Sequence, residues 1–548
     1  MVDYNRIGDA GAAALAEALH TNASLTNLDL RGNDVSAVGA EALAEMLRMN
    51  ATLTSLDLGF NSTGADLENF VETETGVAAL VEALRANTTL VNLNVCHNDI
   101  CPTGAAAFGH ALCANSTLTS LNLGHNLKIG DVGTIAFAAS LRTNTSLTTL
   151  NLSYSGISPE GVAVLSEVLS ATTSLTALDL TYNFVGDEGA TALSEMLSSN
   201  SKLTTLNLDY SGIGDSGAAA LSEVLHTNST LKSLTLMYNE IGEAGATAMG
   251  EALRKNITLT SLDLQNNGLG DAGVASLAEA LGMNTALTSL NLESTGVGAT
   301  AASAFADALR TGTRLTTLGL GENSIGDVGA AAIFGALCEN ATLTALQLYS
   351  NTIGDAGVVA LGDALRVNDT LTKLELTANN LGEAGVAAIG DALCANVKLK
   401  ELQLYGNNAG QAGAIAIGKA MRVNTALEKL SLSRNKVNAV GAVALAEGLC
   451  TNDSLIALDL SNNDVGDTGA VALAEMLRSN ARLTSLLLNS SGVNVAGAAA
   501  LAGALCTNAT LATLDLEFSA FGDAGDAVFA EALRTNVALT SLKLRSRF

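Results

Sequence analysis

The stretch Leu25-Thr-Asn-Leu-Asp-Leu-Arg-Gly-Asn33 decides the fold of this chain, because its leucine pattern recurs along the whole sequence. Copies of Leu-x-x-Leu-x-Leu, one of them with Val95 in the last place, begin nineteen times between Leu25 and Leu539, and most are 28 residues apart. Between the copies lies a second phrase, whose plainest form is Ile7-Gly-Asp-Ala-Gly-Ala-Ala-Ala-Leu-Ala-Glu-Ala-Leu19. A fixed period of this length is typical of a solenoid, in which each unit buries its apolar side against its neighbours.

Each unit is predicted to contain one strand and one helix. The alternation in Leu28-Asp29-Leu30 is the period-2 pattern of a strand with one buried face. The second phrase places apolar residues at helical spacing, which predicts a buried stripe made of Gly11, Ala14, Leu15, Ala18 and Leu19. The sequence therefore predicts an α/β fold: a right-handed solenoid with a parallel concave sheet of about 19 strands and convex helices.

Polar residues stand where the chain changes direction. We expect the side-chain amide of Asn33 to pair with backbone groups of adjacent turns, which would otherwise have no partner. The aspartate of the Gly-Asp pair, such as Asp9, is expected at the N-cap or in the first turn of the helix. The helix is expected to end at Asn22, Asn50 or Asn87 in the left-handed conformation that asparagine tolerates.

The repeat also predicts curvature. Neighbouring strands lie about 4.8 Å apart, whereas packed helices cannot approach closer than about 8–10 Å. This mismatch bends the stack by roughly 20° per unit. For the whole chain we expect a nearly closed horseshoe whose ends are displaced by the twist of the sheet.

One continuous array is predicted over residues 1–548, because no proline-rich, serine-rich or charged linker interrupts the period. Residues 62–76 contain an insertion that breaks the 28-residue frame and is expected to bulge from the loop edge. It carries the acidic residues Asp66, Glu68, Glu72 and Glu74. Neither end of the chain carries an evident polar cap of the kind that solenoids need.

The composition limits the classes of partner that we expect. A net charge of −27, with 27 basic residues scattered among 54 acidic ones, argues against nucleic acid and favours a basic partner protein. Apolar runs of 18 residues or more and a secretory leader are both absent from the sequence, so no membrane association and a cytoplasmic location are expected. Five of the seven cysteines share one column of the repeat, too far apart for disulfides, and are expected to be free thiols.

The combination of strand, asparagine turn and alanine-rich helix resembles the ribonuclease-inhibitor class of leucine-rich repeats. It is similar to the repeat region of NOD-like receptors, in particular the CARD-containing-3-like type with its Gly-Ala-x-Ala-Leu-Ala-Glu-Ala-Leu helix. The resemblance implies the horseshoe fold and a role in binding proteins. Nucleotide-binding and death-fold domains are absent from the sequence, and the tryptophans typical of ribonuclease inhibitor are missing, so ribonuclease inhibition does not carry over.

Tyrosines stand out against a predicted concave surface of small polar residues. Four of them follow a strand at the same place in consecutive units, and they are Tyr154, Tyr182, Tyr210 and Tyr238. Neighbours in this column are expected about 5 Å apart, within stacking range. The column is either a ladder that only covers the loop edge or a contact strip for a partner, since exposed tyrosine is favoured at interfaces.

A second candidate patch combines charged and aromatic residues on neighbouring strands: Tyr349, Lys373, Glu375, Glu401, Gln403, Tyr405, Lys429 and Arg434. The alternative interpretation is a cross-strand ladder of ion pairs through Lys373, Glu401 and Lys429, which contributes little when exposed.

Catalysis requires unlike groups that converge in a pocket, and the sequence offers none. His97 and His125, beside Cys96, form the one plausible pair of histidines, and we find no further metal ligand at a matching spacing. We expect no catalytic, cofactor or metal site. The prediction is a non-catalytic scaffold or sensor module that binds a protein on its concave face and strand-to-helix loop edge. The alternatives are a GTPase activator of the Ran-activator type and an architectural subunit of a large assembly.

Overall fold

The computed structural model describes residues 4–63, 74–171 and 174–545, in which strands and helices alternate as predicted. The chain contains two compact units, unit 1 (Met1–Leu269) and unit 2 (Gly270–Phe548). Most of the predicted insertion at residues 62–76, including Asp66, Glu68 and Glu72, lies outside the described residues. The single domain and the horseshoe curvature of the whole chain stay predictions.

The described part of unit 1 contains nine strands of three residues each. Every strand pairs in parallel with the next, so that Leu28 lies beside Leu56 and Leu206 beside Leu234. The strands are β1 (Asn27–Asp29), β2 (Ser55–Asp57), β3 (Asn92–Asn94), β4 (Ser120–Asn122), β5 (Thr149–Asn151), β6 (Ala177–Asp179), β7 (Thr205–Asn207), β8 (Ser233–Thr235) and β9 (Ser261–Asp263). The helices are α1 (Gly8–Leu19), α2 (Ala37–Met49), α3 (Thr75–Ala86), α4 (Pro102–Leu112), α5 (Gly130–Leu141), α6 (Pro159–Ala171), α7 (Gly186–Ser199), α8 (Asp215–Leu225) and α9 (Glu243–Leu253).

Unit 2 repeats this arrangement with ten parallel strands and ten helices in its described part. The strands are β10 (Ser289–Asn291), β11 (Thr317–Gly319), β12 (Ala345–Gln347), β13 (Lys373–Glu375), β14 (Glu401–Gln403), β15 (Lys429–Ser431), β16 (Ala457–Asp459), β17 (Ser485–Leu487), β18 (Thr513–Asp515) and β19 (Ser541–Lys543). The helices are α10 (Gly270–Leu281), α11 (Ala299–Thr311), α12 (Gly326–Leu337), α13 (Val359–Val367), α14 (Glu383–Leu393), α15 (Gly410–Met421), α16 (Ala439–Leu449), α17 (Gly466–Ser479), α18 (Val495–Leu505) and α19 (Gly522–Ala532).

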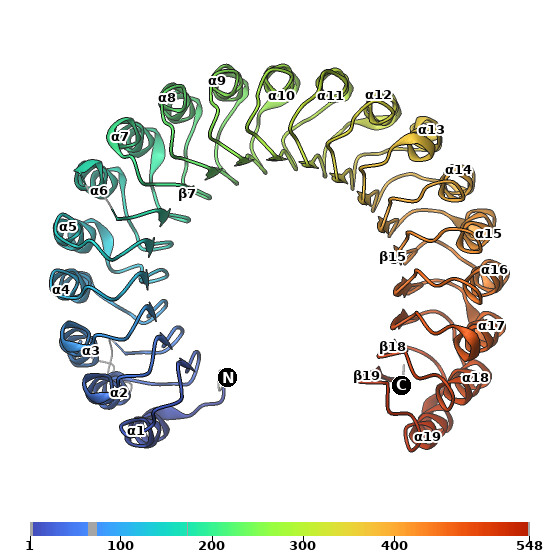
Figure 1. Cartoon of the computed structure of the whole chain (residues 1–548), viewed down its shortest axis with the longest axis horizontal. Helices are drawn as coiled ribbons and strands as arrows, with labels where there is room; N and C mark the ends of the chain where they lie inside the picture. Colours follow the sequence, from blue (N-terminus) through green and yellow to red (C-terminus); the bar gives the residue numbers. More distant parts are fainter. Residues whose placement is uncertain (1–3, 64–73, 172–173, 546–548) are drawn as a thin grey trace. The chain divides into compact units, whose positions relative to one another are not determined.

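Within each unit the strands line the concave side and the helices the convex side, with the repeated leucines buried between the two layers (Figure 1). Leu30, Leu58 and Leu208, for example, have no exposed surface. The predicted solenoid of parallel strands and convex helices is therefore confirmed. None of the helices in the described ranges has the length and apolar character needed to cross a membrane.

The predicted helix stripe was partly wrong. In α1 the side chains of Ala14 and Ala18 are exposed, whereas Ala12 and Ala16 are buried. Inner helices bury the same positions together with the neighbouring leucines, as Ala218 and Leu221 do in α8. A helix packed against both a sheet and adjacent helices buries a broad face, which a single i, i+3, i+4 stripe does not describe.

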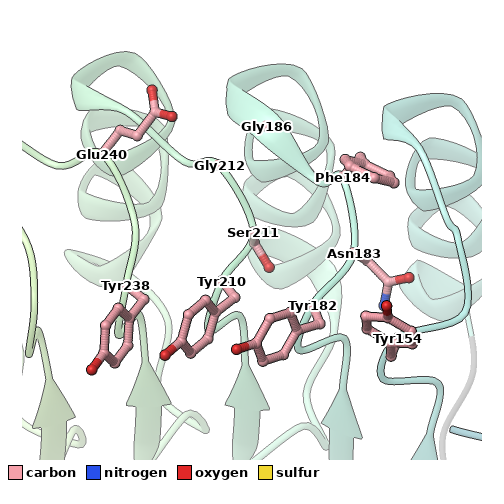
Figure 2. A pocket seen from close by; sticks show the side chains of 10 residues that line it. All are labelled: Tyr154, Tyr182, Asn183, Phe184, Gly186, Tyr210, Ser211, Gly212, Tyr238 and Glu240. Atoms are coloured by element: carbon pink, nitrogen blue, oxygen red, sulfur yellow. The ribbon is translucent and has the colours of Figure 1, made fainter. Parts of the chain in front are cut away.

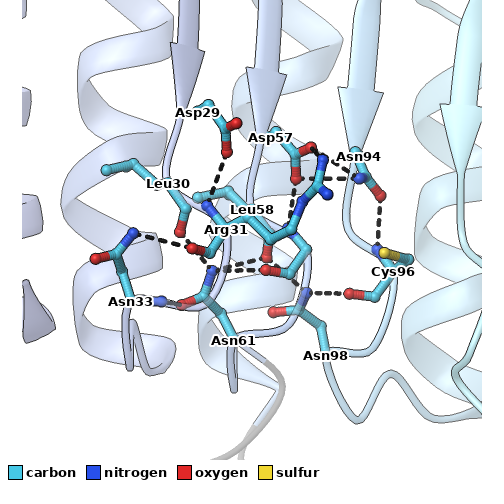
Figure 3. A network of polar contacts seen from close by, with 11 residues as sticks. Asp29, Leu30, Arg31, Asn33, Asp57, Leu58, Asn61, Asn94, Cys96 and Asn98 are labelled. Carbon is cyan, nitrogen blue, oxygen red and sulfur yellow. Dashed lines mark hydrogen bonds and ion pairs between the residues drawn. The ribbon is translucent and has the colours of Figure 1, made fainter. Parts of the chain in front are cut away.

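Where the turn position at the loop edge is asparagine, its side chain connects neighbouring coils as predicted (Figure 3). Asn61 Nδ2 donates to the carbonyl oxygens of Leu30 at 3.0 Å and Leu58 at 2.9 Å. Its Oδ1 accepts from the amides of Asn33 at 3.0 Å and Val35 at 2.9 Å. One buried side chain thus satisfies backbone donors and acceptors of two coils.

The Gly-Asp carboxylate lies in the first turn of its own helix, but it caps the helix of the following coil. Asp215 Oδ1 accepts from the amides of Gly242 at 2.7 Å and Gly245 at 2.8 Å, which are the N-cap and third residue of α9. Glu74 similarly accepts from the Cys101 amide ahead of α4 at 2.9 Å. An anion at a helix N-terminus satisfies free amides and is attracted by the helix dipole, so each coil stabilises the next.

The predicted left-handed asparagine at the helix end was wrong. Asn50 is extended, with φ −76° and ψ 125°, and Asn87 adopts the same conformation. Asn50 Nδ2 donates to the Leu19 carbonyl of the preceding helix at 2.8 Å, and Asn50 Oδ1 accepts from the Leu53 amide at 2.7 Å. The residue is selected because its side chain bridges two coils, and the extended backbone directs the chain into the next strand.

We predict that Asn379→Ala destabilises unit 2 by about 2–4 kcal/mol, because it leaves several buried backbone groups without a partner. Asn379 donates to Leu348 at 2.9 Å and accepts from Asn351 and Ile353, both at 3.0 Å. Urea unfolding and hydrogen exchange of the flanking coils measure the loss.

The matched control is Ser211→Ala, at the same position of a unit 1 coil, where the hydroxyl donates to the Asp209 carbonyl at 3.2 Å. It is expected to cost less than about 1 kcal/mol. Equal losses for the two variants would contradict the role assigned to the asparagine.

Candidate functional site

Seven aromatic side chains form a continuous row along the loop edge of unit 1, and we call this row the aromatic strip. Its members are Phe60, His97, His125, Tyr154, Tyr182, Tyr210 and Tyr238, one from each of seven consecutive coils. Successive ring centroids are 4.8, 6.3, 5.3, 5.8, 4.0 and 4.2 Å apart. The predicted close spacing of the four tyrosines is therefore confirmed: Tyr182, Tyr210 and Tyr238 are stacked, whereas Tyr154 meets Tyr182 edge-on at 69°. The row also extends further than predicted.

All members of the strip occupy one backbone position, the residue just before the asparagine or serine of the turn. This position is left-handed throughout, with φ between 49° and 57° in the strip. Other coils have Gly32, Ser294 or Ala378 there, also left-handed. A left-handed conformation costs an ordinary residue about 1–2 kcal/mol, so the turn geometry imposes it and glycine would suit it best. Bulky rings are retained here against that cost.

The faces of three tyrosine rings pack against one another. The rings of Tyr182, Tyr210 and Tyr238 are stacked and almost parallel, with interplanar angles of 10° and 12°. Partial burial, together with hydrogen bonds to the hydroxyls of Tyr182 and Tyr238, raises the pKa of Tyr210 above its ordinary value. The strip therefore offers ring edges and phenol oxygens to a ligand, while most of its ring faces are covered.

A groove of about 560 Å³ runs beside the four tyrosines (Figure 2). Ser211, Gly186 and Gly212 line its floor, and Phe184 and Glu240 stand on the side away from the tyrosines. The Phe184 side chain is 71% exposed. A Cβ added at Gly212 would meet no atom within 4 Å, so the floor is open to a ligand.

Two acidic residues, Asp209 and Glu240, adjoin this region. Asp209, next to Tyr210, is only 9% exposed, and burial raises its pKa to about 6, with further contributions from Asp263 and Asp179. The Met237 amide donates to Asp209 Oδ1 at 2.7 Å and partly offsets this effect. The potential along the tyrosine part of the strip favours a cationic ligand.

The second predicted patch divides into separate contacts in unit 2. Lys373 lies 3.3 Å and Lys429 3.9 Å from the carboxylate of Glu401, which is the predicted ladder of cross-strand ion pairs. On the loop edge, Arg434 donates to the Tyr405 hydroxyl at 3.1 Å, with its guanidinium carbon 5.9 Å from the ring centroid.

Two further members of the patch point elsewhere. Burial and a hydrogen bond to Glu293, two coils earlier, raise the pKa of Tyr349, whose ring occupies the space where Gly321 lacks a side chain. Glu375 accepts from Gln347 on the neighbouring strand at 3.5 Å. The structure thus does not gather these residues into one site.

Sequence reasoning missed three members of the strip, Phe60, His97 and His125. They hold the same place before the turn asparagine as the tyrosines do. Two intervals in the row differ from 28 residues, from Phe60 to His97 and from His125 to Tyr154. Aligning the coils on the asparagine, and searching the column for any aromatic ring, would have found them.

Comparison with known proteins identifies the family. A family model described as leucine-rich repeat matches segments that together cover more than half of the chain. The matched residues are 2–16, 21–44, 114–138, 143–166, 172–194, 199–222, 227–250, 255–278, 313–334, 339–362, 367–390, 423–446 and 451–474. The chain therefore belongs to the leucine-rich repeat family, whose repeats generally serve as protein-interaction modules. No curated protein matches the chain.

The chain is similar to two solved structures. The crystal structure of a TLR13–ssRNA13 complex is 20% identical, with a TM-score of 0.54; the alignment covers 90% of this chain and 66% of that one. The chain thus spans just under two thirds of that protein's length, and the likeness concerns the fold alone. The leiomodin-1 actin-binding site 2 is 24% identical over 25% of this chain and 79% of its own, with a TM-score of 0.23.

We predict that Asp209→Asn stabilises unit 1 at neutral pH by about 2–3 kcal/mol and leaves it unchanged near pH 4. The folded-state pKa of about 6 lies above the ordinary 3.8, so the native chain binds more protons between these values and loses stability as the pH rises through them. An asparagine oxygen still accepts from Met237. Thermal unfolding of both proteins from pH 4 to pH 8 checks this, and parallel pH profiles would contradict it.

Proposed function

We propose that this leucine-rich repeat protein is a non-catalytic scaffold or sensor module that binds a partner protein at the loop edge of unit 1 and the adjoining concave face. The aromatic strip is the observation that carries the proposal. The finer resemblance to NOD-like receptor repeats is consistent with such a role. The Ran-type GTPase activator and the architectural subunit stay alternatives from the sequence.

Exposure of the strip supports the proposal. Phe60, Tyr154, Tyr182 and Tyr238 are between 41% and 46% exposed, although small residues occupy the same position in other coils. Tyrosine gives an interface a large rigid contact area together with a polar end, and it is enriched at binding surfaces. A contiguous aromatic row on a surface is unusual for a protein without a partner.

Charge favours a basic protein as the partner. The chain has 54 acidic and 27 basic residues, and Asp209 and Glu240 adjoin the tyrosines. Opposite charge steers association and excludes acidic competitors. The same field repels phosphate, so nucleic acid is not proposed as the ligand, although the TLR13 structure is titled as a complex with single-stranded RNA.

We predict that the Tyr182→Ala/Tyr210→Ala double variant binds its partner at least about tenfold more weakly, because two adjacent aromatic anchors commonly dominate an interface. The full chain serves as bait in the native cell, with captured proteins identified by mass spectrometry and then measured individually. Alanine suits this backbone position, since Ala378 occupies it at φ 51°.

The matched control is Phe518→Ala in unit 2, which removes an exposed aromatic ring from the same backbone position. It is expected to retain the partner. An unchanged set of partners with the double tyrosine variant would reject the strip as the binding surface.

A further inference from the structure

The groove beside the strip is a gap in a second column of side chains. Phe184, Gly212 and Glu240 occupy the same place in three consecutive coils, two residues beyond Tyr182, Tyr210 and Tyr238. Gly212 has φ +66° and contributes no side chain, so the column opens between an apolar residue and a carboxylate (Figure 2). The groove therefore has an apolar end and an anionic end.

The distance between the two ends follows from the backbone. The Phe184 amide donates to the Ile157 carbonyl of the previous coil at 2.8 Å, and the Glu240 amide donates to Ile213 at 2.9 Å. Coils at this column are therefore still spaced like hydrogen-bonded strands, about 4.8 Å apart. The backbones at Phe184 and Glu240, two coils apart, are therefore about 10 Å from each other along the edge.

The strip restricts the chemistry of the occupant. The stacked faces of Tyr182, Tyr210 and Tyr238 leave no space for a planar ring between them. The phenol oxygen of each tyrosine can act as a hydrogen-bond acceptor. Together with the Glu240 carboxylate, these oxygens suit a cationic donor, namely a lysine or arginine side chain.

We propose that the groove binds an extended, proline-rich segment of a partner protein that carries an apolar residue and a lysine or arginine three positions apart. The apolar residue packs on Phe184, and the cation pairs with Glu240 over the edge of the strip. This inference rests on the proposed function and names the kind of segment that the partner presents.

The residue spacing of the polyproline II helix matches the spacing of the two ends of the groove, so we infer that the segment binds in this conformation. It has three residues per turn and a rise of about 3.1 Å, so residues i and i+3 share one side about 9.3 Å apart, close to the two-coil spacing. An α-helix brings the same pair within about 6 Å, and a β-strand turns them to opposite faces. Aromatic-lined grooves with acidic neighbours suit such preordered segments, which lose little entropy on binding.

The test uses the full chain and a fluorescein-labelled peptide, Ala-Pro-Leu-Pro-Pro-Arg-Pro-Ala, in fluorescence anisotropy titrations at physiological salt. We expect saturable binding that weakens about tenfold when the leucine becomes serine, when the arginine becomes glutamate, or when leucine and arginine are made adjacent. Among the chain variants, Phe184→Ser, Glu240→Lys and Gly212→Asn are each expected to weaken binding by a similar factor. Asparagine tolerates the left-handed backbone, so Gly212→Asn fills the groove with little strain.

Two controls separate the groove from general charge or folding effects. Asp464→Lys and Gly492→Asn make the same changes in the same column of unit 2 and are expected to leave binding unchanged. The Glu240→Lys variant is expected to bind the glutamate peptide better than the arginine peptide. That exchange of preference would not arise from a folding defect.

Several outcomes would overturn the inference: no binding at millimolar peptide, equal binding of the adjacent-pair peptide, or equal losses in the unit 2 controls. The proposed function is judged separately by partner capture. If the double tyrosine variant loses its partner while the peptide fails to bind, the strip remains the interface and this class of segment is rejected.

Discussion

The turn asparagine is the interaction on which the rest of the structure depends. Strands of three residues cannot satisfy the backbone of the loops that follow them, and those loops are stacked close together at the edge of the sheet. A side-chain amide that donates and accepts across two coils, as that of Asn61 does, removes this cost without water. Because the geometry is the same in each coil, the residue before the asparagine is held left-handed, whatever its side chain.

This constraint explains how a functional surface can arise from a monotonous repeat. Each position of the repeat recurs in every coil, and the stack places the side chains at that position beside one another. In unit 1 the left-handed position holds aromatic rings, and they stack without any change in the backbone. In unit 2 the same position is mostly small or charged, and Arg434 there meets Tyr405 from a different column. The framework is thus shared, and only the side chains of one column distinguish the two surfaces.

The sequence predicted what depends on periodicity alone: parallel strands, buried leucines, the bridging asparagines and the stacked tyrosines. It did not predict which coil a polar side chain serves. Asp215 lies in the first turn of α8 yet caps α9, and Asn50 bridges back to the helix before it, because the direction of a side chain is set by packing and not by spacing. Tyr349 likewise reaches Glu293 two coils back by passing over Gly321. The repeat that contains Gly321 gives no sign that this glycine makes room for a ring from the next coil. The set of buried helix positions was partly mispredicted for a related reason, since it depends on how the helix packs against the sheet and against the adjacent helices.

The capping of each helix by the carboxylate of the coil before it has a consequence for how such a chain changes length. Every bond of this kind joins residues about one repeat apart, as Asp215 and Gly242 are, so removing or duplicating one whole repeat joins a donor to an equivalent acceptor. Recombination in register would leave the hydrogen bonding intact. It would, however, lengthen or shorten the row of rings and change which side chains flank it. Evolution can therefore adjust the reach of the recognition surface in steps of one coil without redesigning the scaffold.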